Sequence, residues 1–297
     1  MSPKLRLEQA LLTRILIATS SQVRKRGEPF IPASLIVCVA TAIYFHLEHG
    51  QTTTAMLHSF MILSAIFIAS LIAAIAGFAF SAVAAALLVH IYHEPAEMVR
   101  TLLVCSIAVQ IYCTAMILGK VQWRELAPYL IGGLITAPIG IVILKHVSPN
   151  TYALLLGLLL VSYSLYALTN PLRVAASKNA GMDAAVGALG GITGGVAAFP
   201  GAFPVIWCSA RGLSKEHQRA ICQPYILIMQ VSSLGWFEHA HSGQTRSLVE
   251  LWTFIPVALV GAWLGFEVFR RISPRQFNIV VLAVLGVSGA LLLARGW

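Results

Sequence analysis

The chain has 297 residues, of which 58% are hydrophobic and only 10% are charged. Soluble domains carry roughly 25% charged residues, so this composition excludes a soluble protein and indicates a helical protein that crosses a membrane several times. The formal charge is +9. The basic residues lie in short loops, where they mainly set the orientation of the protein in the membrane. An electrostatic preference for anions is the second interpretation.

The first 29 residues are predicted to form a basic segment on the cytoplasmic face. Basic and aliphatic side chains alternate over residues 4–19, and a basic run follows at 24–26. An amphipathic helix in the membrane interface fits this pattern. A secretory signal does not, because no clean apolar core or cleavage site follows.

Apolar runs of about 20 residues bounded by charge or proline predict the membrane spans. An extra N-terminal span covers 31–47, within the segment 30–54. The next run, 55–92, is too long for one straight span and contains Gly77, so we expect a broken or hairpin element there. Further spans are predicted at 97–118, 125–146, 150–169, 216–237, 248–270 and 275–296, with a loop at 170–182 and a glycine-rich element at 183–211.

The glycine-rich element is the most unusual stretch of the chain. Pro200 and Pro204 each remove a backbone N–H and obstruct a continuous helix. Inside a bilayer, such a break survives only where protein or a water-filled cavity satisfies the freed backbone groups. Two half-helices meeting at 199–201 would bring helix dipoles to membrane depth, as in transporter binding sites. The alternative is a glycine-rich packing face with proline kinks.

The two halves of the chain read as related. Residues 140–149 match 265–274 in a glycine, a basic pair, an aliphatic residue and Ser-Pro. Earlier in each half, Arg100 corresponds to Arg219 and Gln110 to Gln230, in the same order. If the basic N-terminus lies inside, the more basic loops also lie inside, and the two repeats start on opposite sides.

We therefore predict an all-α polytopic membrane protein of two inverted-topology repeats, 55–169 and 183–297. Each repeat would hold a broken or re-entrant element followed by three transmembrane helices, and a cytoplasmic linker at 170–182 would join them. The extra transmembrane helix precedes them. The expected location is a bacterial cytoplasmic (inner) membrane, with the N-terminus inside and the C-terminus outside.

The second repeat resembles a known family. Residues 191–204, followed by Arg211-Gly-Leu-Ser-Lys-Glu-His-Gln-Arg219, are similar to the second-repeat signature of the TauE/SafE sulfite exporter family. The first repeat departs from the pattern, with Gly77-Phe-Ala-Phe-Ser81 where members carry a glycine-rich run and a proline. The resemblance implies an exporter of sulfite or a small organosulfonate, and the family also includes carriers of other sulfur compounds.

An oxyanion substrate needs hydrogen-bond donors and at most one or two cations. The substrate-binding candidates lie at the breaks or in the middle of spans: Ser81, Gln110, Thr193, Gly201, Gln230 and Ser233. For the two glutamines, an ordinary interhelical hydrogen bond is the alternative. Gate or vestibule candidates are Arg100, Arg219 and Gln223, and the alternative for each arginine is a snorkelling interface anchor.

Other chemistry has little support. Glu267 is read as an acid inside a span that either pairs locally with Arg270 and Arg271 or couples protons. We find no metal-ligand spacing, nucleophile triad, P-loop or dinucleotide fingerprint, and so expect no enzyme, cofactor or metal. The scattered cysteines are read as reduced packing residues.

The expected partners are a small anionic substrate (sulfite or a sulfonate) and the lipid bilayer, not nucleic acid. Gly132 and Gly133 serve either internal packing or a homodimer. Two rivals stay open: transport of another organic anion or sulfur compound, and a non-transport membrane assembly subunit. Potential-driven and proton-coupled export, and a gated pore and alternating access, are equally compatible with the sequence.

Overall fold

The computed structural model describes residues 53–88, 91–92, 95–146, 154, 157–158, 160–162, 164–165, 179–197, 199–240, 251 and 253–295. The chain divides into two compact units, 1–57 and 58–297, and the second contains nearly all of the described residues. The expected amphipathic segment at 1–29 and the extra span at 31–47 lie outside the described residues, as does the linker up to residue 178.

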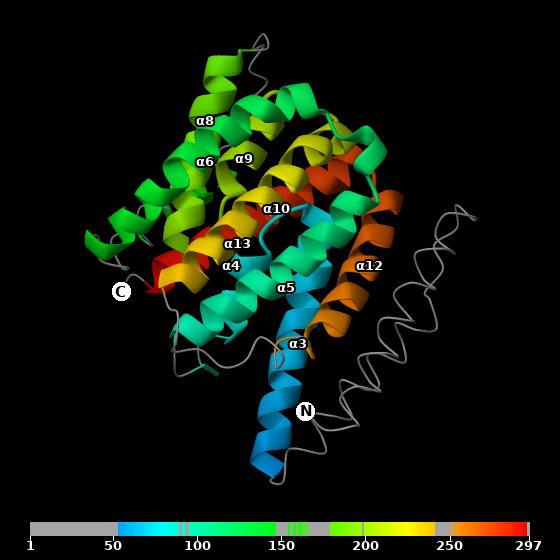
Figure 1. The fold of residues 1–297 in the computed structure, drawn as a ribbon. Coiled ribbons are helices and arrows are strands. Elements are labelled where there is room, and N and C mark those ends of the chain that lie inside the picture. Colours follow the sequence, from blue (N-terminus) through cyan, green and yellow to red (C-terminus); the bar gives the residue numbers. More distant parts are fainter. Residues whose placement is uncertain are drawn as a thin grey trace, which may run out of the picture. The chain divides into compact units, whose positions relative to one another are not determined.

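Every element that the structure describes is helical (Figure 1). The first half holds α3 (Thr53–Ala76), α4 (Phe80–Leu88), α5 (Pro95–Ala115), the short 3-10 helix η1 (Leu118–Lys120) and α6 (Trp123–His146). The second holds α8 (Ala180–Ala197), α9 (Ala202–Ala210), α10 (Lys215–Ala240), α12 (Ile255–Arg271) and α13 (Pro274–Arg295). Three segments of these helices are long and apolar enough to cross a membrane: Ser59–Ala76, Glu97–Ala115 and Pro274–Leu291.

Both expected helix breaks are present. The first separates α3 from α4, where Gly77 and Ala79 have φ values of +87° and +71°. This backbone region is open to glycine but strained for alanine. The second break separates α8 from α9 around residues 199–201. Pro204 does not cause it, because this proline lies in the first turn of α9, where an N–H has no helical acceptor.

The two halves have a similar order of helix lengths. A long helix, α3 with 24 residues or α8 with 18, is followed by a nine-residue helix and then by a long one, α5 with 21 residues or α10 with 26. Two helix contacts between the halves also have counterparts in which the halves are exchanged. Helix α5 packs on α12 and α10 on α6, while α6 packs on α8 and α12 on α3. The inverted repeat itself remains a prediction.

Helices α6 and α8 pack backbone to backbone (Figure 1). A Cβ at Gly132 would overlap the carbonyl of Ala184, and a Cβ at Gly191 would overlap the backbone of Gly133. Glycine is required here because the two helix backbones approach too closely for any side chain. Gly132 and Gly133 therefore serve internal packing in this structure.

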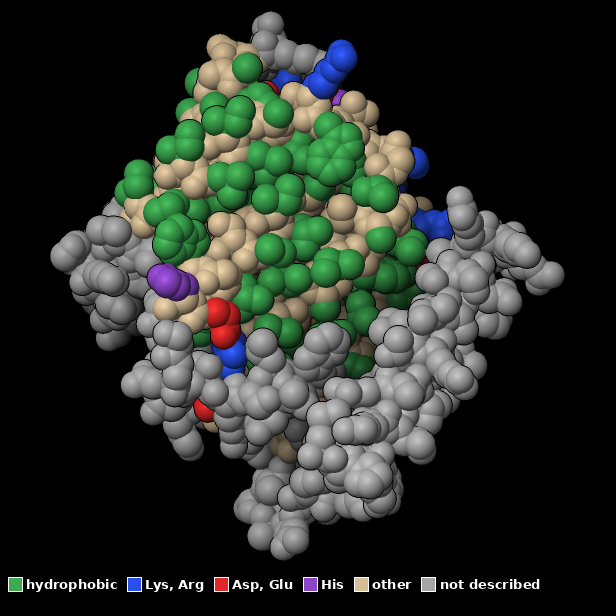
Figure 2. Space-filling view, viewed as in Figure 1, with side chains coloured by type: hydrophobic (Ala, Val, Ile, Leu, Met, Phe, Trp, Pro, Cys, Tyr) green, Lys and Arg blue, Asp and Glu red, His purple; other side chains and the backbone are tan. Residues whose placement is uncertain are grey.

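Another side of α6 is exposed and apolar. Ile131, Ile135 and Ile139 are 60%, 67% and 49% exposed and recur at helical spacing. In Figure 2, the visible face over the described residues is covered largely by hydrophobic side chains, with charged groups near its margins. An apolar surface of this kind fits contact with lipid.

Candidate functional site

The two helix breaks meet in space although they lie far apart in the sequence. The rings of Phe78 and Phe199, one from each break, have centroids 6.2 Å apart. Gly201 packs so closely that a Cβ there would lie 3.1 Å from Phe78 Cβ and 2.7 Å from Ile226 Cδ1. The glycine therefore permits the contact, and α10 lies against both breaks.

A buried arginine from α10 lies against the first break. Arg219 is only 2% exposed, and a Cβ at Gly77 would lie 3.7 Å from its Nε. Its Nη2 donates to the carbonyl oxygens of Ala74 and Ile75, in the last turn of α3. The last carbonyls of a helix have no donor within the helix, and the negative end of the helix dipole attracts a cation. Arg219 thus caps the buried C-terminus of α3.

Among the described residues, the remaining donors of Arg219 are not used. Its Nε and Nη1 have no hydrogen-bond partner among the described residues, and none of their ion pairs involves this guanidinium. One face of the cation is covered by aromatic rings, with Cζ 3.6 Å from the centroid of Phe269 and 5.2 Å from that of Phe266. Buried N–H groups normally have acceptors, so unpaired ones on a cation indicate a place for an anion.

Further unpaired polar groups lie on the helices around Arg219. Gln223, one turn along α10, is fully buried and neither of its amide atoms has a hydrogen-bond partner in the described part of the chain. Cys113 of α5 lies close to both Arg219 and Gln223. Gln110 lies one turn before Cys113, and its buried Oε1 also has no partner in the described part of the chain. Ser81, in the first turn of α4, has a buried Oγ that finds no partner among the residues that the structure describes.

The other predicted binding residues have partners or lack a free side-chain donor. Thr193 Oγ1 donates to the carbonyls of Leu189 and Gly190, at 3.2 and 3.1 Å. Ser233 Oγ donates to the carbonyl of Met229 at 2.9 Å, also within its own helix. Gly201 contributes backbone only.

The two predicted glutamines, Gln110 and Gln230, differ in their hydrogen bonding. Gln230 Oε1 accepts from Ser106 Oγ of α5 at 3.0 Å, as the interhelical alternative expects. Gln110 lies one turn from Ser106 on α5, yet no hydrogen bond joins the two amides in the described structure. Their role as a facing pair therefore remains a prediction.

The two matched arginines have different environments. Arg100, 5% exposed, donates from Nε and Nη2 to the two carboxylate oxygens of Glu238, at 2.6 and 2.8 Å. This ion pair ties α5 to the far end of α10. Both side chains are buried within the described structure. Of the two, only Arg219 lacks a carboxylate partner within the described ranges.

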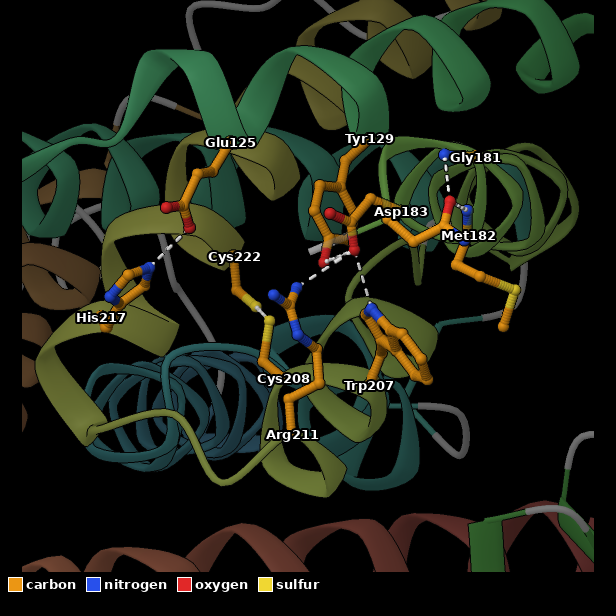
Figure 3. A network of polar contacts seen from close by, with 11 residues as sticks. Glu125, Tyr129, Gly181, Met182, Asp183, Trp207, Cys208, Arg211, His217 and Cys222 are labelled. Carbon is orange, nitrogen blue, oxygen red and sulfur yellow. Dashed lines mark hydrogen bonds and ion pairs between the residues drawn. The ribbon is translucent and has the colours of Figure 1, made fainter. Parts of the chain in front are cut away.

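The sequence reasoning missed the buried acid Asp183. Asp183 in the first turn of α8 is 6% exposed, and its Oδ1 accepts from Tyr129 Oη at 2.7 Å and Trp207 Nε1 at 2.8 Å. Arg211 Nη1 completes the set at 3.2 Å (Figure 3). Nothing in the sequence around residue 183 distinguishes this acid from an ordinary helix-start residue. The donors come from α6 and α9, which only packing brings together.

Two smaller groups of ionic contacts complete the described part of the chain, one within α12 and one between α10 and α6. Glu267 pairs with Arg270 at 3.0 Å and Arg271 at 3.8 Å, which confirms the local ion pair expected for it. His217 Nε2 lies 2.7 Å from Glu125 Oε2 and links α10 to α6. No group of three or more His, Cys, Asp or Glu side chains in the described ranges is placed to hold a metal ion.

Residues 61–292 match the family model described as Sulfite exporter TauE/SafE. The chain belongs to this family. No curated protein and no solved structure matches the chain significantly. TauE/SafE proteins are membrane transporters of sulfur compounds rather than enzymes, and this membership agrees with the apolar helices and the exposed apolar surface of the chain.

Proposed function

We propose that this protein exports a small sulfur-containing oxyanion, with sulfite as the first candidate, through a site where the two helix breaks meet. The observation that carries the proposal is Arg219, a buried cation at the junction of the breaks whose Nε and Nη1 have no partner in the part of the chain that the structure describes. An oxyanion supplies the acceptors that these donors lack.

The neighbouring groups suit the same ligand. Gln223 offers a buried amide N–H and Ser81 a buried hydroxyl, and neither group has a hydrogen-bond partner within the described ranges. Helices α4 and α9 both begin at the breaks, and the N-terminus of a helix presents free N–H groups and a positive dipole end to an anion. Together these donors can replace the hydration shell that the anion loses on entering the site.

The architecture that we propose around this site is a pair of inverted repeats in the inner membrane, with the N-terminus inside and the C-terminus outside. The reciprocal helix contacts between the halves support the repeat. The interior-negative potential favours export, because each negative charge that leaves gains about 2.3 kcal/mol per 100 mV. In this arrangement Arg219 and Gln223 bind substrate, and the Arg100–Glu238 pair closes the outer ends of α5 and α10.

The test is sulfite efflux from proteoliposomes that contain the full chain, with and without an interior-negative potential. We expect the potential to raise the efflux rate. Arg219→Gln and Gln223→Leu should each lower it at least about tenfold, because a hydrogen bond to a charged group contributes about 1.5–3 kcal/mol. Arg271→Gln is the matched control, since the Arg271 side chain is 80% exposed and pairs with Glu267 instead of contributing to the site.

Three results would separate the alternatives. Efflux of sulfonates but not of sulfite would keep the site and replace the substrate. Native efflux in Arg219→Gln would refute the site. No movement of any small anion would refute the exporter and favour a membrane assembly subunit.

A further inference from the structure

Helices α5 and α10 pack against each other and run antiparallel (Figure 1). Arg100 near the start of α5 pairs with Glu238 near the end of α10. Further along α5, Ser106 Oγ donates at 3.0 Å to Oε1 of Gln230, which lies earlier in α10. A polar group of one helix thus meets a polar group of the other at two successive levels of the interface.

Polar groups continue along the same interface beyond Ser106. Gln110 and Thr114 follow at intervals of four residues, which places them on the same side of α5. On α10, Gln223 lies opposite this end of α5, because it is a neighbour of Cys113. Gln110 Oε1, Thr114 Oγ1 and both amide atoms of Gln223 are buried and have no hydrogen-bond partner among the described residues.

These side chains form a line between the two helices. We define the polar line as Ser106, Gln110 and Thr114 of α5 together with Gln223 and Gln230 of α10. It begins beside the ion pair between α5 and the far end of α10, and it ends one turn from the buried arginine at the junction of the breaks.

The polar line is long enough to cross most of a membrane. Helix α5 contains Glu97–Ala115, one of the described segments that can span a bilayer. From Arg100 to Thr114 this helix advances about 21 Å at 1.5 Å per residue, whereas the hydrocarbon core is about 30 Å thick. The line therefore extends well beyond a local binding site.

A structural role explains only part of the polar line. An interhelical hydrogen bond accounts for Ser106 and Gln230. It does not account for Gln110, Thr114 and Gln223, whose buried polar atoms find no donor or acceptor within the described ranges. Such groups are costly inside a membrane, and where they occur they mark the path of a substrate or an ion.

We propose that the interface between α5 and α10 is the route by which the anion leaves Arg219 and reaches the outer face. The amides and hydroxyls of the polar line replace successive parts of its hydration shell. These side chains are buried, so the route is closed in this structure and opens when α5 and α10 move apart. The inference rests on the proposed function and adds a route to it.

Thiols along α5 allow the route to be tested with few changes to the chain. Cys113 lies beside Gln223, and Ser106→Cys or Gln110→Cys places a thiol further along the polar line. Cys105 is the control within each chain, because it is as buried as Ser106 but points about 100° away from it around the helix.

The probe is 2-sulfonatoethyl methanethiosulfonate, a small sulfonate. A thiolate attacks its sulfenyl sulfur, so that a mixed disulfide forms and methanesulfinate leaves. Proteoliposomes of the full chain would be exposed on both sides to this anion or, separately, to uncharged methyl methanethiosulfonate. Peptide mass spectrometry would follow each cysteine. The uncharged reagent corrects for differences in thiol reactivity between positions.

We expect the ratio of charged to uncharged labelling rates to be at least about tenfold higher on the polar line than at Cys105. A sulfonate that enters an apolar helix interface loses its hydration without compensation, whereas the polar line supplies partners. The comparison of Cys113 with Cys105 uses the native chain. Ser106→Cys and Gln110→Cys then show whether access continues outward.

The outcomes separate the route from the proposed function. Equal ratios at all positions would overturn the route, as would preferential labelling confined to Cys113. If the native chain exports sulfite while neither introduced thiol is labelled preferentially, the route fails and the proposed function stands. If the introduced thiols are labelled preferentially and no anion is exported, the anion-accessible line stands and the proposed exporter fails.

Discussion

Asp183 is the point where three separate donors converge, and replacing it with asparagine tests what this convergence contributes. The carboxylate belongs to α8, whereas Tyr129 comes from α6, and Trp207 and Arg211 come from α9 and its C-terminal end (Figure 3). The substitution keeps the shape of the side chain and an acceptor oxygen. It removes the negative charge opposite Arg211.

The expected cost follows from burial. The side chains of Arg211 and Asp183 are 7% and 9% exposed, and loss of one partner of a buried ion pair destabilises a protein by about 3–5 kcal/mol. Since the asparagine oxygen still accepts from Tyr129 and Trp207, we expect the lower end, about 3 kcal/mol. Tyr129→Phe removes a single bond to a charged acceptor and should cost about 1.5–3 kcal/mol.

The free energy of unfolding can be measured by SDS titration in mixed micelles. In a double-mutant cycle, Asp183→Asn and Arg211→Gln should be non-additive by at least about 1 kcal/mol. Arg271→Gln, at an 80% exposed side chain, should cost less than about 0.5 kcal/mol. The reasoning is refuted if Asp183→Asn is as mild as this control, or if the cycle is additive.

Three further outcomes are expected. Gly132→Ala should destabilise the protein by about 1–3 kcal/mol in the same titration, because its Cβ would overlap the carbonyl of Ala184. Gly235→Ala, with no atom within 4 Å of the added Cβ, should be neutral or stabilise by up to about 1 kcal/mol, and equal losses would argue against close α6–α8 packing. Ala79→Gly should stabilise by about 1 kcal/mol by relieving the φ of +71°, so a loss of stability would contradict the strain there. Glu238→Gln removes the bidentate carboxylate from Arg100 and should raise the anion leak of proteoliposomes. The exchanged pair Arg100→Glu/Glu238→Arg should restore the native leak. An unchanged leak in the single variant would exclude a gate formed by this ion pair.

Part of the proposed site could be predicted from the sequence. Arg219, Gln223, Gln110 and Ser81 stand out because polar side chains are rare in such apolar runs. Whether these side chains have hydrogen-bond partners could not be predicted from the sequence. Ser81 and Thr193 look alike as hydroxyls near a break, yet only the Thr193 hydroxyl has acceptors among the described residues.

The matched arginines show the same limit. The sequence predicts that Arg100 and Arg219 correspond to each other, but Arg100 pairs with Glu238, whereas Arg219 donates to the carbonyls at the end of α3. Asp183 was passed over altogether, because an acid in the first turn of a helix is ordinary until its donors from α6 and α9 are known.

By itself, the sequence determined the helical membrane class and the positions of the two breaks. Apolar runs and the backbone preferences of glycine and proline act within a few residues, so they can be read locally at Gly77 and Pro200. Only the tertiary structure decided that the breaks meet and that Asp183 joins α6, α8 and α9. It also decided that two nitrogens of Arg219 find no acceptor among the described residues. Whether a buried polar group is satisfied depends on what lies across from it, and its partners here come from distant parts of the chain that packing alone brings together.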